Sequence, residues 1–322
     1  MSAQKILRAL ALPHIIDNKS LDVSVSVGVS TYPSDGPDAE SLMNKADTAM
    51  YEAKQHGRNN YQFFRRDMHA RLADRQLLER DLRYALGRNE FLLHYQPKFN
   101  LQTGQITGVE SLIRWEHSQR GTVYPGEFVP IAEECGLILA IGRWVLLEAC
   151  RQARAWSDAG LGVVPVAVNV SASEFGDKDF VSGVRAALIA TGVEPPNLEL
   201  ELTESVLMQD AESTVRTLVA LKTMGVRLAI DDFGTGYSSF TYLRRFPVDA
   251  LKLHQSFVQE ITVDPGDATI VDAMINIGKS LKQRVIAEGV ETVSYTHLDV
   301  YKRQVRSSSG TLPYKYPRKN ST

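Results

Sequence analysis

Hydrophobic residues near the N-terminus follow first a strand period and then a helix period. Every second residue over 21–29 is apolar, which predicts a half-buried strand, and the turn residues 32–36 end it. Apolar residues then recur at helical spacing over 42–53, Gly57 ends this helix, and a second short strand follows over 61–64. This unit is too small to bury its own apolar face, so we expect it to be cut from a larger domain.

A charged segment follows this unit. Apolar residues recur at roughly helical spacing between Met68 and Leu86, which predicts a connecting helix. We therefore expect a partial domain over 1–65, a connecting helix over 66–88, a main domain over 89–293 and a tail of different character over 294–322.

The main domain alternates short apolar runs with helical patterns. The runs are 163–168, 198–202, 226–230, 250–253 and 285–287, and helical patterns over 180–190, 211–224 and 268–281 lie between them. Continuously apolar strands that alternate with helices are typical of a parallel sheet buried on both faces. Over about 200 residues this favours a (β/α) barrel, and the absence of a dinucleotide-type glycine loop after any run disfavours an open sheet.

The last residues of the chain do not continue this pattern. Residues 294–322 are basic and polar without a sustained apolar period, and they show no sign of a final strand and helices. The expected fold class is therefore α/β, an incomplete TIM-like (β/α) barrel that lacks its C-terminal end, preceded by a partial α+β unit and followed by a disordered tail.

Composition narrows the class of function. A net charge of −2 argues against a nucleic-acid polymer as partner, because such binding needs a basic face. No run of 18 or more uncharged apolar residues occurs, and the N-terminus lacks a signal-peptide pattern, so we expect no membrane contact within this chain. Cys135 and Cys150 have no partner pattern, which favours buried, reduced thiols in a cytoplasmic protein.

Polar side chains stand where the predicted strands end. They are Glu110, Asn169, Glu201 with Glu204 just beyond, Asp231, Asp232, Lys252 and Glu288. Because the carboxyl ends of barrel strands meet at one mouth, we expect these side chains around a single cavity. A lone carboxylate after a strand is usually a helix cap or a surface charge, but acidic or amide groups at successive strand ends are hard to explain as caps.

So many carboxylates in one cavity require positive charge to compensate them. Like charges at close range raise one another's pKa, and one lysine does not balance six acidic groups. Hard divalent cations do, and oxygen-only ligands suit Mg²⁺ or Mn²⁺. Two ions that share a carboxylate are suited to activating a water and stabilising a leaving alkoxide in phosphodiester cleavage.

Two further features adjoin this cluster. In the loop 232–239, Gly234 and Gly236 permit a tight turn with positive φ beside the aspartate pair. His254 shares a strand face with Lys252, and we expect it to support the site structurally rather than to bind the ions.

The motifs around these residues resemble EAL-domain cyclic di-GMP phosphodiesterases over about residues 77–292. The matching motifs are Tyr95-Gln96-Pro97, Glu110-Ser111-Leu112-Ile113-Arg114-Trp115, Asn169-Val170-Ser171, Glu201-Leu202-Thr203-Glu204, Asp231-Asp232-Phe233-Gly234-Thr235-Gly236-Tyr237-Ser238-Ser239 and Glu288-Gly289-Val290-Glu291. The resemblance implies an enzyme of bacterial second-messenger signalling that hydrolyses one phosphodiester bond of cyclic di-GMP, giving linear pGpG.

The resemblance also implies roles for individual residues. Glu288 is expected to orient or deprotonate the attacking water, with Lys252 also in contact with it. Gln96 and Arg114 are expected to bind substrate, Arg114 at a phosphate. The residues implied to hold two Mg²⁺ or Mn²⁺ ions are Glu110, Asn169, Glu201, Asp231 and Asp232. Those implied to act in support are Glu204, which anchors the loop 232–239, and Glu291 at the site.

This chain departs from the family pattern in three places. The signature reads Glu110-Ser111-Leu112 rather than Glu-Ala-Leu, which leaves the ligand unchanged. His254 stands where an aspartate is commoner. The family's last strand and its flanking helices are absent after Thr292, and an open barrel exposes strand edges.

Residues 1–65 similarly resemble the C-terminal half of a GGDEF diguanylate cyclase domain. The signature motif and the residues for GTP are missing from this stretch, so we expect no cyclase activity. A fragment of a longer tandem signalling protein is the simplest account, with a homodimer through the EAL barrel. The membrane attachment of such a parent stays open.

Three hypotheses stand at this point. The full acidic set favours a hydrolase. The alternative is a non-catalytic cyclic di-GMP receptor or interaction module, which loss of a metal ligand or of the glutamate base would favour, and neither loss is seen. The third is that the barrel as written is too incomplete to fold.

Overall fold

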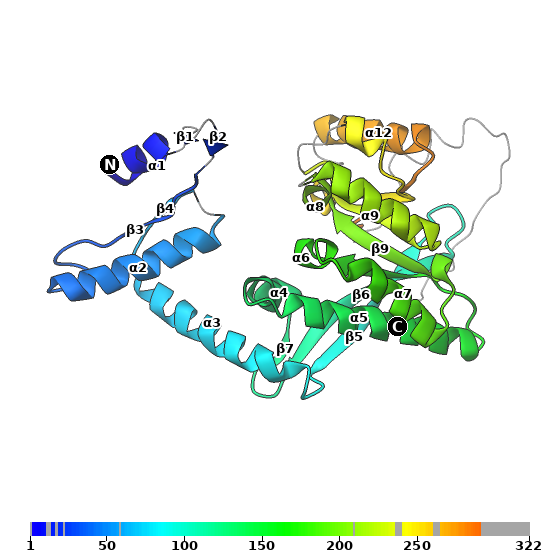
Figure 1. Cartoon of the computed structure of the whole chain (residues 1–322), viewed down its shortest axis with the longest axis horizontal. Helices are drawn as coiled ribbons and strands as arrows, with labels where there is room; N and C mark the ends of the chain where they lie inside the picture. Colours follow the sequence, from blue (N-terminus) through cyan, green and yellow to red (C-terminus); the bar gives the residue numbers. More distant parts are fainter. Residues whose placement is uncertain are drawn as a thin grey trace, which may run out of the picture. The chain divides into compact units, whose positions relative to one another are not determined.

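The computed structural model describes residues 2–10, 14–16, 19–21, 23–57, 59–208, 210–235, 240–259 and 265–290. The chain forms two compact units, one over Met1–Arg88 with Pro130–Ala132 and the other over Asn89–Val129 with Glu133–Thr322 (Figure 1). The expected tail over 294–322 lies outside the described residues.

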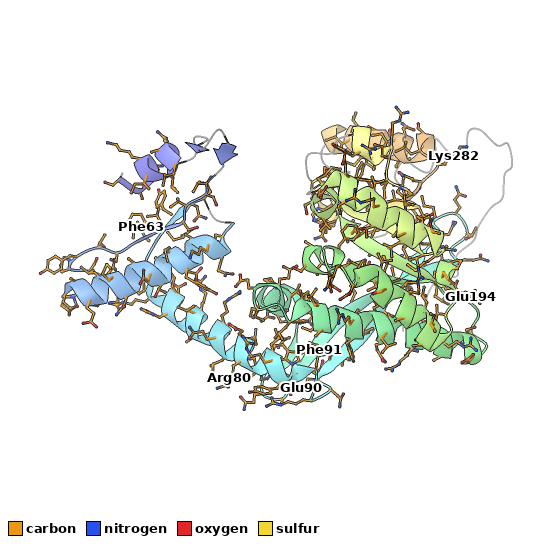
Figure 2. The ribbon with its side chains drawn as sticks, viewed as in Figure 1. Phe63, Arg80, Glu90, Phe91, Glu194 and Lys282 are labelled. Carbon is orange, nitrogen blue, oxygen red and sulfur yellow. The ribbon has the colours of Figure 1, made fainter. Side chains whose placement is uncertain are left out.

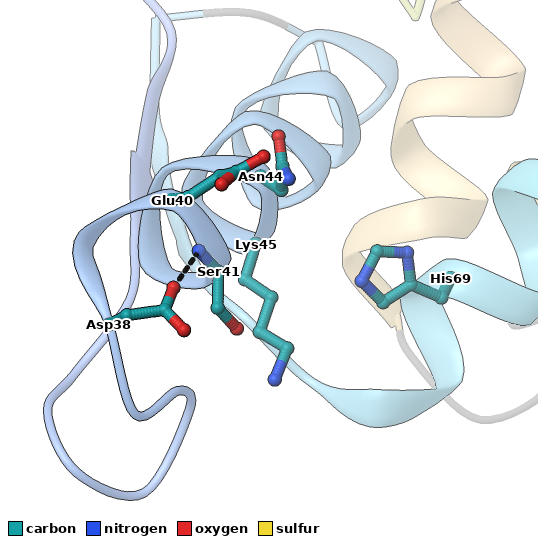
Figure 3. A pocket seen from close by; sticks show the side chains of 6 residues that line it. All are labelled: Asp38, Glu40, Ser41, Asn44, Lys45 and His69. Atoms are coloured by element: carbon teal, nitrogen blue, oxygen red, sulfur yellow. Dashed lines mark hydrogen bonds between the residues drawn. The ribbon is translucent and has the colours of Figure 1, made fainter.

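The N-terminal unit is a small α/β assembly. In chain order its elements are α1 (Ser2–Leu10), β1 (His14–Ile16), β2 (Lys19–Leu21), β3 (Val27–Val29), α2 (Ala39–Gln55), β4 (Tyr61–Phe63) and α3 (Arg66–Ala85). Strands β3 and β4 pair in parallel, and α2 packs against both. The helix begins where the Asp38 carboxylate accepts a hydrogen bond from the Ser41 N–H at 2.8 Å (Figure 3).

Two features of this unit bear on the predictions. The helix over 42–53 is confirmed as α2, and Gly57 follows it with φ of 87°. The single strand over 21–29 is wrong, because the structure has β3 only over Val27–Val29 and no regular element over residues 23–26. A strand exists only where a neighbour accepts its hydrogen bonds, and β4 supplies such a neighbour for three residues.

The second unit is built on a larger sheet. Its strands are β5 (Phe91–Phe99), β6 (Ile106–His117), β7 (Gly121–Val123), β8 (Val166–Val170), β9 (Leu198–Thr203), β10 (Arg227–Phe233), β11 (Ala250–Leu253) and β12 (Arg284–Ala287). Its helices are α4 (Pro125–Glu134), α5 (Ile138–Asp158), α6 (Ala172–Phe175), α7 (Phe180–Thr191), the 3-10 turn η1 (Pro195–Asn197), α8 (Glu204–Met208), α9 (Ala211–Thr223), α10 (Phe240–Leu243), α11 (Gln255–Gln259) and α12 (Pro265–Ser280).

The sheet curls as half a barrel. Its order is β12-β11-β10-β9-β8-β6-β5, parallel from β6 to β12, with β5 and β7 antiparallel to β6. Helices α5, α9 and α12 pack on β8, β10 and β12 along the outside of the sheet (Figure 1). Because helices cover one face and the curl encloses the other, strands such as β9 and β11 are buried on both faces.

An aromatic cluster fixes the first hairpin of the sheet to its neighbouring helices. Phe91, labelled at the start of β5 in Figure 2, lies 5.7–6.1 Å from the rings of Trp115, Phe128 and Trp144. Trp115 is fully buried, and its indole N–H donates to Glu90 at 2.9 Å. This cluster holds β6, which carries part of the candidate site, in one position.

Candidate active site

The ammonium group of Lys252 is the centre of the candidate site. Strand β11 places this side chain inside the curl of the sheet, where it is 1% exposed. Its Nζ lies near one carboxylate oxygen from each of three other strands and from the residue that follows β12: Glu201 at 2.7 Å, Glu288 at 2.7 Å, Asp231 at 3.1 Å and Glu110 at 3.3 Å. Residues up to 178 positions apart in sequence therefore meet at one point.

The register of the parallel strands produces this meeting. Asn169 of β8 lies directly opposite Glu201 of β9, and Asp231 of β10 lies opposite Thr203, two residues further along β9. Asn169 also donates from Nδ2 to Glu110 on β6 at 2.8 Å. Parallel strands that carry polar residues near their carboxyl ends thus bring them to the same edge of the sheet.

The aspartate pair requires a break in the regular strand. Successive side chains of a strand point to opposite faces, which would separate Asp231 from Asp232. The β10–β11 register shifts between Ile230 and Phe233, and Asp232 has φ of 53°, in the left-handed region. This irregularity brings one oxygen each of Asp231, Asp232 and Glu288 within 4.8 Å of one another.

The charges of this cluster fit a divalent cation. Burial raises the pKa of Glu201 to about 7 and also raises the pKa of Glu288 and of Asp232, the last with help from Asp231. Burial opposes ionisation of Glu110 as well, but Lys252 and Asn169 hold its pKa below its usual range. Four carboxylates share the single ammonium group of Lys252. A cluster of oxygen donors with surplus negative charge can bind a hard metal ion.

Glu110 stands at a different place in its strand from the one predicted. It was expected to end a strand, but it lies inside β6, which continues to His117 because β5 pairs with it as far as Trp115. Its side chain still reaches the cluster, since Asn169 Nδ2 donates to its carboxylate at 2.8 Å and Lys252 Nζ lies 3.3 Å from it.

Gln96 and Arg114 share the β5–β6 hairpin with Glu110. Gln96 lies directly opposite Glu110, and Arg114 is four residues further along β6 on the same face, about 13 Å away. The guanidinium of Arg114 donates to the Ile113 carbonyl at 2.8 Å and lies over the Tyr124 ring at 5.2 Å. The structure thus aligns both residues with the cluster on one hairpin, without contact between Arg114 and the carboxylates.

Glu204 and His254 lie at the border of the site. Glu204 is 4% exposed; its Oε2 accepts from the Gly234 N–H at 3.1 Å, while Oε1 has no hydrogen-bond partner among the described residues. His254 places Nε2 3.9 Å from Asp232 and holds Nδ1 against Ser256 at 2.9 Å. Glu291 lies outside the described residues.

The sequence interpretation missed a second set of charges beneath the cluster. Lys98 of β5 contacts Glu201 at 2.5 Å and Glu199 at 3.0 Å, and Arg284 of β12 also pairs with Glu199. The sequence contains a pattern that indicates these charges: leucine and glutamate alternate over residues 198–202, so Glu199 and Glu201 lie on the same face of the strand.

A separate hollow occurs in the N-terminal unit. It encloses about 430 Å³ between α2 and α3 and is lined by Asp38, Glu40, Ser41, Asn44, Lys45 and His69 (Figure 3). None of the predicted site residues lines it, and the Asp38 carboxylate is already engaged as the cap of α2.

Comparison with known proteins identifies the family. Residues 79–298 match the EAL domain. The chain belongs to the EAL-domain family. Residues 1–60 match "Diguanylate cyclase, GGDEF domain", so a GGDEF fragment precedes the EAL domain, and the resemblance to both families is confirmed.

Curated proteins with similar sequences include cyclic di-GMP phosphodiesterases. The "Bifunctional diguanylate cyclase/cyclic di-GMP phosphodiesterase MucR" of Pseudomonas aeruginosa is 46% identical over 290 residues, which are 90% of this chain and 42% of that protein. The "Cyclic di-GMP phosphodiesterase PdeR" of Escherichia coli is 38% identical over 290 residues, 90% of this chain and 44% of that protein. The chain therefore spans less than half the length of these curated relatives.

Solved EAL structures support the barrel architecture. "PaMucR Phosphodiesterase, c-di-GMP complex" superposes with a TM-score of 0.68 at 47% identity, covering 70% of this chain and 91% of that one. The FimX EAL domain from Pseudomonas aeruginosa, bound to c-di-GMP, gives a TM-score of 0.62 at 26% identity, covering 68% and 87%. The prediction of a TIM-like α/β fold of EAL type is confirmed.

Proposed function

We propose that this chain hydrolyses cyclic di-GMP to linear pGpG in a metal-dependent reaction. The observation that carries the proposal is the meeting of Asp231, Asp232 and Glu288 around Lys252 at the carboxyl ends of the sheet. Relatives named as cyclic di-GMP phosphodiesterases, and a phosphodiesterase structure solved as a cyclic di-GMP complex, support the same substrate.

The donor set fits two hard divalent ions. The residues that would hold Mg²⁺ or Mn²⁺ are Glu110, Asn169, Glu201, Asp231 and Asp232, all through oxygen atoms. When bound, such ions supply Lewis-acid stabilisation of the charge that develops on phosphate and lower the pKa of water. The surplus of carboxylates over lysines at this point is the structural reason for expecting them.

The remaining residues act on water and substrate. Glu288 is the proton acceptor for the attacking water: burial raises the pKa of its carboxylate, and Lys252 at 2.7 Å favours its ionised form. Gln96 and Arg114 bind cyclic di-GMP along the β5–β6 hairpin, where Arg114 suits a phosphate and its distance from the cluster suits an extended ligand. Glu204 anchors the turn at Gly234, next to the aspartate pair.

The organisation of the protein completes the proposal. Residues 1–65 are a partial GGDEF domain, 66–88 a connecting helix and 89–293 the EAL domain, with Glu291 in a supporting position. The EAL domain forms a homodimer in the cytoplasm, which light scattering and cell fractionation test. No helix in the described part of the chain is long and apolar enough to cross a membrane.

Hydrolysis of cyclic di-GMP with Mg²⁺ or Mn²⁺, followed by chromatography of pGpG, tests this function. A Glu288→Gln variant keeps the shape of the side chain and is expected to lower kcat by about 10²–10⁴-fold, the usual contribution of a general base. Binding of cyclic di-GMP without hydrolysis by the unaltered chain would establish the receptor alternative instead. Neither binding nor hydrolysis by a cooperatively folded chain would overturn both.

A further inference from the structure

A buried ion-pair chain crosses the inside of the curled sheet beneath the candidate metal site. Lys98 starts on β5 and reaches β9, although β6 and β8 lie between these two strands in the sheet. Its Nζ lies 2.5 Å from Glu201 Oε1 and 3.0 Å from Glu199 Oε1, with only 14% of the side chain exposed. The chain ends at Arg284 on β12, which pairs with the other oxygen of Glu199.

Glu201 joins this ion-pair chain to the site above. Its side chain is completely buried, and its two oxygens have different partners: Oε1 accepts from Lys98, and Oε2 accepts from Lys252 at 2.7 Å. Two cations on opposite sides of one carboxylate restrict its rotation, because turning the group would break both contacts at once. Only the Oε2 side faces the four-carboxylate cluster around Lys252.

We infer that Lys98 is a positioning residue, which holds the Glu201 carboxylate in the orientation that a divalent cation requires, and that Glu199 and Arg284 hold Lys98 in turn. This inference rests on the ion site of the proposed function. It assigns a role to three residues that contact neither the ion nor the substrate, namely Lys98, Glu199 and Arg284. Glu199, for example, lies two positions before Glu201 on the same strand, about 6.6 Å deeper inside the barrel.

The charge balance of the ion-pair chain supports a positioning role. Lys98 contacts two carboxylates, Glu201 and Glu199, and Glu199 in turn contacts two cations, Lys98 and Arg284. Each of these charges is therefore paired, whereas loss of Lys98 would leave Glu201 Oε1 buried without a donor from this strand.

The experiment measures Mn²⁺ binding directly, from the free-ion signal in electron paramagnetic resonance, on the full chain without substrate. Lys98→Met is expected to weaken Mn²⁺ binding about tenfold, within the range seen when groups behind a metal ligand are removed. At saturating Mn²⁺ the KM for cyclic di-GMP should stay unchanged, because the Lys98 ammonium group is engaged by Glu199 and Glu201. A merely structural defect would instead lower the fraction of active protein at every Mn²⁺ concentration.

Lys222→Met is the matched control. Lys222 is likewise paired with a carboxylate in this barrel, Asp249 alone, at 2.8 and 2.9 Å, and this pair does not contact Glu201. The Lys222→Met variant should bind Mn²⁺ with the same affinity as the unaltered chain. Glu199→Gln serves if Lys98→Met does not fold, since it keeps the side-chain shape, and it should weaken Mn²⁺ binding in the same direction by a smaller factor.

Three outcomes test the positioning role of Lys98 and the ion site on which it depends. Weaker binding in Lys98→Met or Glu199→Gln, with normal binding in Lys222→Met, supports the positioning role. Normal Mn²⁺ binding in folded Lys98→Met, or in Glu199→Gln where Lys98→Met does not fold, overturns it and leaves the proposed function intact. No Mn²⁺ binding by the unaltered chain overturns the ion site of the proposed function, and the positioning role with it.

Discussion

Replacing Lys252 with methionine removes the cation that four carboxylates share. Methionine has a similar volume, so the change leaves little cavity and acts mainly through charge. The Nζ–oxygen distances are 2.7–3.3 Å, and at an effective dielectric constant of about 20 each such contact corresponds to about 5–6 kcal/mol of Coulomb attraction before desolvation is subtracted. Desolvation offsets most of this sum, so the net loss is that of a broken buried pair, about 3–5 kcal/mol.

A divalent cation changes this expectation. In excess EDTA the Lys252→Met chain should lose about 3–5 kcal/mol of unfolding free energy. With saturating Mn²⁺ the ion compensates the same carboxylates and binds only the folded state, so the loss should fall to roughly half or less. The difference between the two conditions, rather than either value alone, carries the prediction.

Urea unfolding followed by tryptophan fluorescence, in EDTA and in Mn²⁺, measures both losses. Lys222→Met again serves as control: its pair with Asp249 is about a third exposed, so its loss should be about 1 kcal/mol or less and equal in both conditions. Equal destabilisation of Lys252→Met with and without Mn²⁺ would show that Lys252 and the ion do not compensate the same charges, and would refute the reasoning.

Three further predictions concern other parts of the chain. Gly28→Ala would place a Cβ 1.8 Å from the Ala46 carbonyl oxygen, so it should push α2 off β3 at a cost of about 1–3 kcal/mol; unchanged hydrogen exchange of the α2 amides would contradict this. Burial raises the pKa of Cys150 to about 11, so iodoacetamide at pH 8 should modify this thiol in urea and spare it in the folded chain, as peptide mass mapping would reveal. Arg114→Lys should raise the KM for cyclic di-GMP about tenfold through loss of bidentate phosphate binding, without altering Mn²⁺ affinity; a change in Mn²⁺ binding instead would place Arg114 at the ions.

The parts of the fold that the sequence predicted are those with local causes. The apolar-rich runs at 198–202 and 250–253 became β9 and β11, because a side chain buried on either face of the sheet must be apolar or paired with an opposite charge. The helix α2 followed from apolar spacing and a terminal glycine. The strand expected over 21–29 failed because alternation describes a face and does not supply the neighbouring strand that a ladder requires.

The candidate site divides in the same way. The sequence by itself determined which residues carry charge at the strand ends, because residue type and position after an apolar run are local facts. Only the tertiary structure decided that Asp232 joins Asp231 at one mouth, through a register shift and a positive φ that the period of a regular strand does not contain. Only it decided that Lys98 meets Glu201 across 103 residues, because the curl of the sheet, and not the spacing along the chain, brings β5 and β9 to the same interior.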